Sequence, residues 1–417
     1  MNSNPPSVIV VGAGAGGDAT AIGLRKQGFE GTVTLIGRES ERPYERPQLS
    51  KQFLAATSNL ERVFLHPEGE YERLGIEYLA EQTAVGGSLN DHCLRLDSGR
   101  TIPFDRLVLA TGSTPRMLPD VPRAANILTL RSLQDAIVVK EQLEDANRIL
   151  IVGAGFIGAE VASSARTLGK DVILVELAET PLERVLGRDV GQVYALMHRD
   201  HGVDLRLGTS VTHWATNNGL LTGVDFSDGS AVNVDLALIA VGATPNVDLA
   251  AELGLDVGPN GVRVDETLQA APGIYAIGDI AAHRHPVFGR RIRVEHWQVA
   301  QRQGTSVAAS IAGEPTPYTE LPWFWSDQYG INLQYVGHAA GFDTSITRGN
   351  LEAESFSVFY LSDDVLDATL SVNDGRSGRY SRDLISNRIS IPEEALATMV
   401  DPSTDLRELV RNLGVKT

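Results

Sequence analysis

Two stretches of the chain repeat one pattern of apolar, glycine and polar positions. The first begins at Ser7 with an apolar segment of strand length, then a glycine-rich turn, a helical segment over 19–27 and a second apolar segment at 32–36. The second begins at Arg148 and has the same order, with a helix over 158–168 and an apolar segment that ends at Glu176. Strand, glycine turn, helix and strand in this order predict a parallel βαβ unit. We therefore expect two such units.

A second pattern also occurs twice. An apolar strand that breaks at glycine, threonine and proline ends each half, at Leu107–Pro115 and again at Leu236–Pro245. This repetition indicates an internal duplication in which both halves end in the same way. A strand at 273–279 is then expected to return to the first half, followed by a helix over 294–304.

Other segments predict shorter elements. Turn residues between apolar runs predict hairpins at 93–105 and 355–371, and Ser50 is a candidate cap for a short helix over 51–55. Further helices are expected near 190–199, 379–388 and 404–413, and short strands are expected at 76–79, 204–207, 211–214, 221–226, 231–234 and 331–336.

The length of 417 residues suits two or three domains. We expect an α/β protein with two Rossmann-like domains and a C-terminal α+β domain. The predicted divisions are 1–114 with 242–322 for the first domain, 115–241 for the second and 323–417 for the third.

Composition and charge narrow the function. The formal net charge of −17 disfavours a generic nucleic-acid-binding role. The single cysteine, Cys93, excludes an internal disulfide, an all-cysteine zinc site and an iron–sulfur cluster, and no metal site is predicted. The opening residues lack the basic segment of a signal peptide, and no apolar run reaches the length of a membrane span. We expect a cytoplasmic protein that does not bind membranes.

The two glycine turns carry the candidate chemistry. In the first, Gly12 makes the tight turn, Gly14 lets the backbone approach a pyrophosphate and Gly17 lets the helix pack close to the strand. The helix N-terminus offers free N–H groups and partial positive charge to phosphates. One such motif can be a turn that binds no ligand, but its recurrence at 153–158 makes that alternative weak. Two dinucleotide sites in one chain imply electron transfer between a tightly bound and an exchanging cofactor.

Five segments allow comparison with known families. They are Pro43–Lys51, Ala110–Gly112, Gly153–Glu160, Ala276–Asp279 and Pro322–Tyr329. Through them the sequence resembles the NADH-dependent ferredoxin and rubredoxin reductases, in particular the reductase components of bacterial Rieske oxygenase and cytochrome P450 systems. These reductases are glutathione-reductase-like flavoproteins, so the resemblance implies that both Rossmann-like domains are dinucleotide-binding domains of the glutathione-reductase-like kind. Apoptosis-inducing factor is a more distant relative. The likeness covers essentially the whole chain.

The resemblance implies FAD in the first domain and NADH in the second. Relatives often carry Asp at position 38, where this chain has Arg38, so the resemblance shifts the acidic ribose contact to Glu39. It also places Lys51 and Trp297 beside the flavin ring. The residues it assigns to FAD are Gly12, Gly14, Gly16, Gly17, Arg38, Glu39, Arg46, Lys51, Ala84, Thr111, Gly112, Arg116, Arg131, Gly278, Asp279 and Trp297.

For NADH, the deciding residue is Glu176. A carboxylate at this position accepts hydrogen bonds from both ribose hydroxyls and repels a 2′-phosphate, so we expect NADH to be preferred over NADPH. No arginine occurs in 177–180 to receive such a phosphate. The residues that the resemblance assigns to NADH are Gly153, Gly155, Phe156, Ile157, Gly158, Glu160, Glu176, Arg184 and Gly242.

The expected reaction passes a hydride from nicotinamide to flavin, which requires positioning more than a protein acid or base. Lys51 and Glu160 match a family pair near the two rings, and we assign them an assisting role through an ion pair. The expected acceptor is a [2Fe-2S] ferredoxin, which accepts one electron at a time and feeds a Rieske oxygenase or a cytochrome P450. Its candidate docking patch is basic and consists of His283, Arg284, His285, Arg290, Arg291 and Arg293.

Alternatives stay open. Rubredoxin could replace ferredoxin as acceptor, and a non-enzymatic NADH-sensing flavoprotein resembling apoptosis-inducing factor is the rival of a different class. A disulfide reductase of the same fold needs a cysteine pair beside the flavin, and a single-cysteine peroxidase needs a cysteine near Leu49 or Ser50; neither is present. The fold allows a monomer or a homodimer.

Overall fold

A parallel sheet around β1 (Ser7–Val11) organises the first of two units into which the chain divides. The computed structural model describes residues 6–414. The first unit combines the chain up to Glu45 with 61–114 and 244–322, and the second combines 46–60, 115–243 and the chain from Trp323 onward. The chain passes between the units through β8 (Ser113–Pro115) and β17 (Ala243–Pro245), which pair with each other. The three-domain division expected from the sequence stays a prediction.

The main sheet of the first unit has the strand order β20-β21-β7-β1-β2-β3. On β1, Val8 to Val11 are all buried, as expected for a central parallel strand that is covered on both faces. The predicted return strand is confirmed, because β21 pairs in parallel with β7. The other strands of this sheet are β2 (Thr32–Ile36), β3 (Ile76–Leu79), β7 (Arg106–Leu109), β20 (Gln269–Ala271) and β21 (Ile274–Ala276).

Helices α1 (Ala15–Lys26) and α8 (Trp297–Ala312) pack against each other in this unit. They approach closely because Gly304 lies against the backbone of Gly16, where a Cβ atom would collide with a carbonyl oxygen.

The first unit also contains two short helices and two smaller sheets. The helices are α2 (Glu70–Arg73) and α7 (Asp248–Glu252). One sheet consists of β4 (Ala84–Ser88), β5 (Cys93–Leu96) and β6 (Thr101–Pro103), and the other consists of β18 (Val257–Gly258), β19 (Gly261–Val264), β22 (Ala281–His285) and β23 (Arg290–Ile292).

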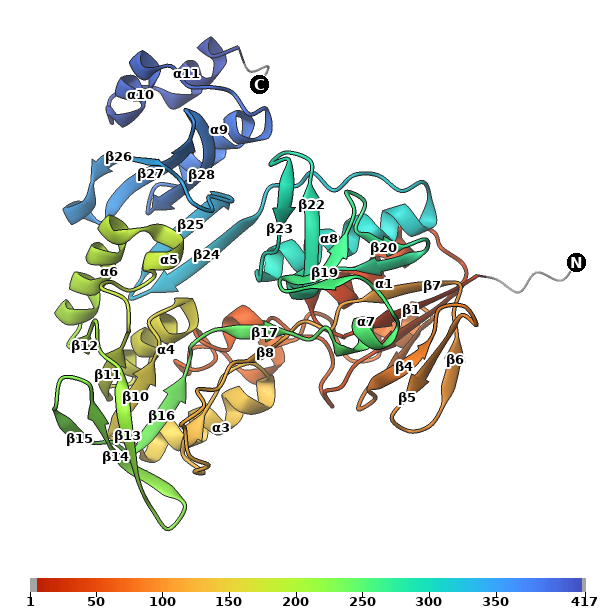
Figure 1. The fold of residues 1–417 in the computed structure, drawn as a ribbon, viewed down its shortest axis with the longest axis horizontal. Coiled ribbons are helices and arrows are strands. Elements are labelled where there is room, and N and C mark those ends of the chain that lie inside the picture. The colour runs from red at the N-terminus through yellow and green to blue at the C-terminus, as the bar shows by residue number, and fades with distance from the viewer. Residues whose placement is uncertain (1–5, 415–417) are drawn as a thin grey trace, which may run out of the picture. The chain divides into compact units, whose positions relative to one another are not determined.

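The second unit contains a parallel sheet built in the same way around β10 (Arg148–Val152), with the order β12-β11-β10-β16-β9. Its strands are β9 (Ile127–Leu128), β11 (Asp171–Val175), β12 (Asp204–Arg206) and β16 (Leu236–Ile239). Its helices are α3 (Leu133–Asp145), α4 (Phe156–Thr167), α5 (Glu183–Leu186) and α6 (Arg188–Asp200). Strands β13 (Val211–Asn217), β14 (Leu220–Phe226) and β15 (Ala231–Asn233) form a separate antiparallel arm, green in Figure 1.

The C-terminal part of the second unit is an antiparallel sheet with helices, drawn in blue in Figure 1. Its core is shared with α5 and α6: Leu186 and Tyr194 pack in one cluster with Tyr335 and Tyr360, and the Tyr360 hydroxyl donates to the Leu186 carbonyl over 2.8 Å. The sheet order is β24-β25-β28-β27-β26. The elements are β24 (Trp323–Gln328), β25 (Ile331–Gly337), β26 (Thr344–Asn350), β27 (Ser355–Ser362), β28 (Val365–Val372), α9 (Gly375–Ser386), α10 (Glu393–Val400) and α11 (Leu406–Asn412).

The structure confirms both predicted βαβ units and both predicted hairpins. The predicted helix over 51–55 is wrong: this segment is a series of turns after a short 3-10 helix at Arg46–Gln48. Short 3-10 helices also occur at Leu60–Val63, Gly278–Ile280 and Leu351–Ala353. Strands β24 and β26 and helix α10 were not predicted. None of the helices within residues 6–414 is long and apolar enough to span a membrane.

Candidate functional site

The glycine turn of the first unit joins β1 to α1 and leaves its backbone accessible. Gly12 has φ +111°, and a Cβ atom there would collide with the Ala110 carbonyl oxygen. Gly17 lies against the Gly12 carbonyl, so the third glycine also has no room for a side chain. Gly14 differs, because nothing lies within 4 Å of the position of its Cβ. Gly14 is also the N-cap of α1 and supplies no capping side chain. The first turn of α1 therefore offers N–H groups to an anion.

The turn of the second unit, between β10 and α4, has the same construction. Gly153 has φ +101° and lies against the Ala240 carbonyl, and Gly158 lies against the Gly153 carbonyl. Gly155 is the uncapped N-cap of α4, with open space where a Cβ would be. Each unit thus holds one turn with two sterically required glycines and one glycine that faces open space. This cradle fits the pyrophosphate of a dinucleotide.

The acidic residues that follow the second strand of each βαβ unit are held in different ways. In the first unit, Glu39 accepts a short hydrogen bond from the Tyr44 hydroxyl, whereas Arg38 is exposed. In the second unit, the Glu176 carboxylate accepts the Ala154 N–H over 2.7 Å and the Ala178 N–H over 3.0 Å. Glu176 is therefore fixed against the glycine turn, at the position from which an acidic residue contacts a ribose.

Asp279 lies in the 3-10 turn after β21, as the returning strand predicted. One of its carboxylate oxygens accepts the Ser113 hydroxyl over 2.6 Å, and its backbone carbonyl accepts from Arg293. The N–H of the preceding Gly278 donates to the Gln303 side chain over 2.7 Å. These contacts fix the acid beside the start of α8, where Trp297 is the first residue of the helix. Thr111 is fixed nearby in the same unit by reciprocal hydrogen bonds with Asn246.

Lys51 and Glu160 form the predicted ion pair in the second unit. The Lys51 Nζ lies 2.9 Å from Glu160 Oε2, and both side chains are almost completely buried. The same carboxylate accepts the Ser50 hydroxyl over 2.5 Å and, on its other oxygen, the Ser326 hydroxyl over 2.7 Å. Both oxygens of this buried carboxylate are thus compensated, Oε2 by a cation and a hydroxyl and Oε1 by a second hydroxyl.

Ser50 explains why the predicted helix over 51–55 is absent. Its hydroxyl was expected to cap that helix, but it donates to Glu160, and its carbonyl accepts the Ser164 hydroxyl over 2.7 Å. Ser50 and Ser326 were not predicted as site residues. Ser326 does lie in the Pro322–Tyr329 segment that carried the family resemblance, but no local pattern indicates a contact between residues 166 positions apart.

The remaining predicted residues fall into two groups. Two pairs are brought together in the second unit: Arg46 donates to the Arg131 carbonyl over 2.7 Å, and the Arg116 N–H donates to the Gly242 carbonyl over 2.9 Å. Residues predicted for FAD that belong to the first unit are Gly12, Gly14, Gly16, Gly17, Arg38, Glu39, Ala84, Thr111, Gly112, Gly278, Asp279 and Trp297. Arg46, Lys51, Arg116 and Arg131 belong to the second unit, with all the residues predicted for NADH.

Three of the residues predicted for NADH binding differ from the others: two are exposed to solvent, and one makes an aromatic contact. Arg184, in α5, is exposed, and Ile157 is 42% exposed at the start of α4. Phe156 contacts Phe324 edge to face, with ring centroids 5.0 Å apart.

The predicted basic docking patch is wrong in its two histidines. His283 and His285 are each 1% exposed, so neither ring belongs to an exposed patch, and burial also lowers the pKa of His283 to about 4. Arg291 donates to the backbone carbonyls of Val264 and Ala282, and Arg293 pairs with Glu295. These arginines hold the β22–β23 hairpin to its own unit.

Comparison with known proteins agrees with this geometry. Residues 6–304 match the pyridine nucleotide-disulphide oxidoreductase family, and residues 323–410 match the reductase C-terminal family. The chain is 36% identical to putidaredoxin reductase of Pseudomonas putida over 98% of both chains. It is 35% identical to the ferredoxin–NAD(+) reductase component of the anthranilate 1,2-dioxygenase system of Burkholderia cepacia, over 98% of this chain and 99% of that one.

Among solved structures, the reductase in a covalent putidaredoxin reductase–putidaredoxin complex superposes with a TM-score of 0.94 and 35% identity, covering 99% of this chain and 100% of that one. The resemblance and the fold class expected from the sequence are therefore confirmed. The chain belongs to the pyridine nucleotide-disulphide oxidoreductase family, as an oxidoreductase of the ferredoxin reductase type with FAD and NADH as its cofactors.

Proposed function

We propose that this protein transfers electrons from NADH, through FAD, to a [2Fe-2S] ferredoxin that feeds a Rieske oxygenase or a cytochrome P450. The observation that carries the proposal is the pair of equivalent glycine turns, one in each unit, each with an uncapped helix N-terminus and one glycine facing open space. When bound, FAD accepts two electrons from NADH together and can release them singly, which a one-electron acceptor requires.

The single cysteine supports an external acceptor. Family members that reduce disulfides need a redox-active cysteine pair, and this chain has only Cys93. Cys93 lies on β5, opposite Pro103 of β6 and Ser88 of β4, on a small sheet away from the two glycine turns in sequence. Electrons that reach the flavin must therefore leave the chain without passing through a protein disulfide.

In this proposal the buried cluster around Glu160 orients the reacting rings. The ion pair and the two hydroxyls keep the Lys51 ammonium at a fixed position without exposing it to water. A fixed positive charge beside the site can orient the nicotinamide and the flavin, and positioning is the main requirement of hydride transfer. Lys51 and Glu160 thus assist, and no protein acid or base is needed.

The choice of NADH over NADPH is assigned to Glu176. Its carboxylate is held by two backbone N–H groups, so it cannot easily turn away from a 2′-phosphate. We expect Glu176→Ala to reduce the ratio of kcat/KM for NADH to that for NADPH by about tenfold, because the substitution removes both the ribose contact and the repulsion. Glu179→Ala, three residues further on and exposed, is the matched control.

The experiment that tests the proposal is anaerobic titration of the purified yellow protein with NADH. It is followed by turnover with a panel of ferredoxins and a rubredoxin, with cytochrome c as the final acceptor. Rapid flavin bleaching and ferredoxin-dependent turnover are expected. Turnover with rubredoxin but with none of the ferredoxins would identify rubredoxin as the acceptor. A long-lived reduced complex that passes electrons to neither protein would favour the NADH-sensing alternative. Cytoplasmic location and the monomeric or dimeric state remain proposals.

A further inference from the structure

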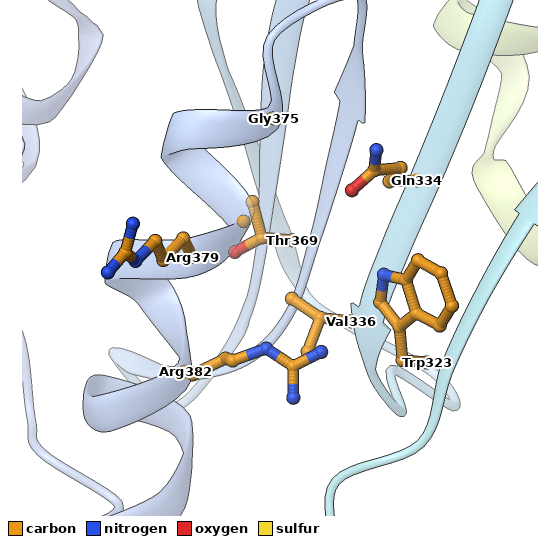
Figure 2. A pocket seen from close by; sticks show the side chains of 8 residues that line it. Trp323, Gln334, Val336, Thr369, Gly375, Arg379 and Arg382 are labelled. Atoms are coloured by element: carbon orange, nitrogen blue, oxygen red, sulfur yellow. The ribbon is translucent and has the colours of Figure 1, made fainter. Parts of the chain in front are cut away.

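The C-terminal part of the second unit contains a pocket that neither glycine turn nor the Glu160 cluster uses. Its volume is about 200 Å³, and it lies between α9 and the strands β24, β25 and β28 of the sheet. Figure 2 shows its walls, which are formed by Trp323, Gln334, Val336, Thr369, Gly375, Gly378, Arg379 and Arg382. The volume is below the range typical of sites for drug-sized molecules, so only a small ligand fits.

The strand register forms one wall of the pocket. Trp323 on β24 is paired with Val336 on β25, and Val336 is paired with Thr369 on β28. Side chains of directly paired residues lie on the same face of a sheet, so the three form a row across three strands. The row offers an indole ring, an apolar side chain and a hydroxyl. Trp323 is stacked on Trp325, with ring centroids 5.3 Å apart, which fixes the indole in place.

Helix α9 forms the opposite wall with one face. Gly375, Gly378, Arg379 and Arg382 follow the spacing i, i+3, i+4, i+7, which places them along one side of the helix. In Figure 2 the Arg382 side chain reaches from α9 toward Val336 and Trp323, whereas the Arg379 guanidinium points away from Trp323. One guanidinium is therefore directed into the pocket beside an aromatic wall.

Neither the backbone conformation nor a close contact requires glycine at positions 375 and 378. Neither has a positive φ, and a Cβ atom at either position would meet no atom closer than ordinary van der Waals contact: 3.9 Å from Gln334 at Gly375 and 3.5 Å from Ser371 at Gly378. Glycine in a helix interior is destabilising relative to alanine, so Gly378 carries a cost that the fold does not require, whereas Gly375 is the first residue of α9. Their effect is to leave open the space that longer side chains would fill.

Thr369 supplies an independent sign of a ligand. Its side chain is completely buried, and its hydroxyl has no hydrogen-bond partner among the residues that the structure describes. A buried hydroxyl without a partner is unfavourable, and native proteins rarely leave one unpaired. Thr369 lines the pocket, but its hydroxyl oxygen has almost no accessible surface, so a ligand bound there would pair with it only after the Thr369 side chain rotates toward the pocket.

We propose that this pocket binds a small aromatic carboxylate of about the size of benzoate. The Arg382 guanidinium would pair with the carboxylate, the Trp323 and Val336 wall would contact the ring, and the Thr369 hydroxyl would donate a hydrogen bond to the ligand. The open space left by Gly375 and Gly378 would receive the ring edge. The site lies on the C-terminal sheet and does not depend on the proposed electron acceptor.

The test is calorimetric titration of benzoate into the FAD-containing full chain. Saturable binding is expected, with benzamide at least about tenfold weaker because it lacks the charge that pairs with arginine. Arg382→Gln should weaken benzoate binding by about tenfold or more, whereas Arg376→Gln, on the same helix but outside the pocket, should change it less than about twofold.

Two further variants separate a site from a folding defect. Thr369→Val keeps the shape and removes the unpaired hydroxyl, so it should weaken benzoate binding about threefold while keeping or raising the unfolding temperature. Gly378→Leu should abolish binding, with the helix retained by circular dichroism. Absence of saturable benzoate binding to the parent chain would overturn the proposal. So would equal competition by inorganic phosphate, or unchanged affinity in both Arg382→Gln and Thr369→Val.

Discussion

At the scale of single residues, Glu160 is the most heavily compensated charge of the candidate site. Its carboxylate pairs with Lys51 and accepts two hydroxyls, from Ser50 and Ser326. Removing one partner of a buried ion pair is costly because the other charge stays buried without compensation. Removing both partners avoids that penalty. The stability of this site should therefore fall more when one charge of the Lys51–Glu160 pair is removed than when both are removed.

This reasoning gives a double-mutant prediction. Glu160→Gln should lower the free energy of unfolding by about 3 kcal/mol or more, because the Lys51 ammonium stays buried beside an uncharged amide. Lys51→Met combined with Glu160→Gln should recover a large part of that loss. Urea unfolding of the wild type, both single variants and the double variant measures the coupling. Strict additivity of the two single losses would contradict the ion-pair account.

Buried histidines determine a second property at this scale, the response of stability to acid. Burial lowers the pKa of His198 and of His283 to about 4, from an unfolded value near 6.5. The unfolded chain therefore takes up protons at a pH where the folded chain does not. The stability associated with these neutral rings is fully present above pH 6.5 and is lost as the pH falls from 6.5 through 4.

We expect each of these histidines to lower the free energy of unfolding by about 2 kcal/mol between pH 7 and pH 5. His66 acts with the opposite sign. Its hydrogen bond to Asp18 raises its pKa, so its contribution is present below pH 6.5 and is lost as the pH rises through the folded pKa, but the ring is partly exposed. Urea unfolding at the two pH values measures the net effect. His198→Phe should flatten the pH dependence, and an unchanged slope would refute the assignment to His198.

At the scale of elements, each glycine turn contains one glycine that is expected to matter for cofactor binding and another that is required for folding. Gly14 and Gly155 face open space, whereas Gly17 and Gly158 lie against a carbonyl oxygen of their own turn. We expect Gly155→Ala to leave the fold and the FAD content intact and to raise KM for NADH about tenfold, because the added methyl occupies the space that the pyrophosphate approaches.

The same substitution in the first unit should act on the other cofactor. Gly14→Ala should reduce the FAD content of the purified protein while the chain remains folded. Gly17→Ala and Gly158→Ala serve as steric controls and should yield mostly insoluble protein, since their methyl groups would collide with backbone. The ratio of flavin absorbance to protein absorbance and steady-state kinetics with NADH distinguish these outcomes. Loss of FAD in Gly155→Ala would show that the two turns are not independent.

Elements differ in how well the sequence predicts them. Strands β1 and β10 are predictable because buried parallel strands are continuous apolar runs. Strand β24 escapes this reasoning because Trp323 to Trp325 are aromatic on both faces, which hides the period of two. The start of α9 is similarly hidden by Gly375 and Gly378, so the helix begins before the predicted residue 379. Glycine in a helix weakens the local signal whether or not it serves a purpose.

The site was predictable only where its chemistry is local. The glycine turns follow from spacing within a few residues, and Lys51 and Glu160 came from family resemblance. The hydroxyl donors could not be predicted, because Ser50 and Ser326 reach Glu160 across 110 and 166 residues. The same limit explains the two histidines that were wrong in the predicted basic patch, since the sequence does not show that the side chains of His283 and His285 on β22 are buried while Arg284 between them is exposed.

At the scale of the whole molecule, the chain has the family fold without the chemistry after which the family is named. Its only cysteine, Cys93, is partly buried on β5 and lies outside every candidate site described above. The route of electrons must then be independent of thiols. Cys93→Ser should keep kcat for ferredoxin-dependent cytochrome c reduction within about twofold of the parent chain, as expected for a substitution outside the reacting groups.

Alkylation of the reduced protein with iodoacetamide should have equally little effect on that turnover, because the modified sulfur takes no part in electron transfer. A disulfide reductase treated in the same way after reduction by NADH would lose its activity, because its electrons are held on a pair of cysteine thiols that the reagent alkylates. A loss of turnover larger than about tenfold in Cys93→Ser, with FAD content and the unfolding midpoint unchanged, would place the thiol on the electron path and refute direct transfer from flavin to the external acceptor.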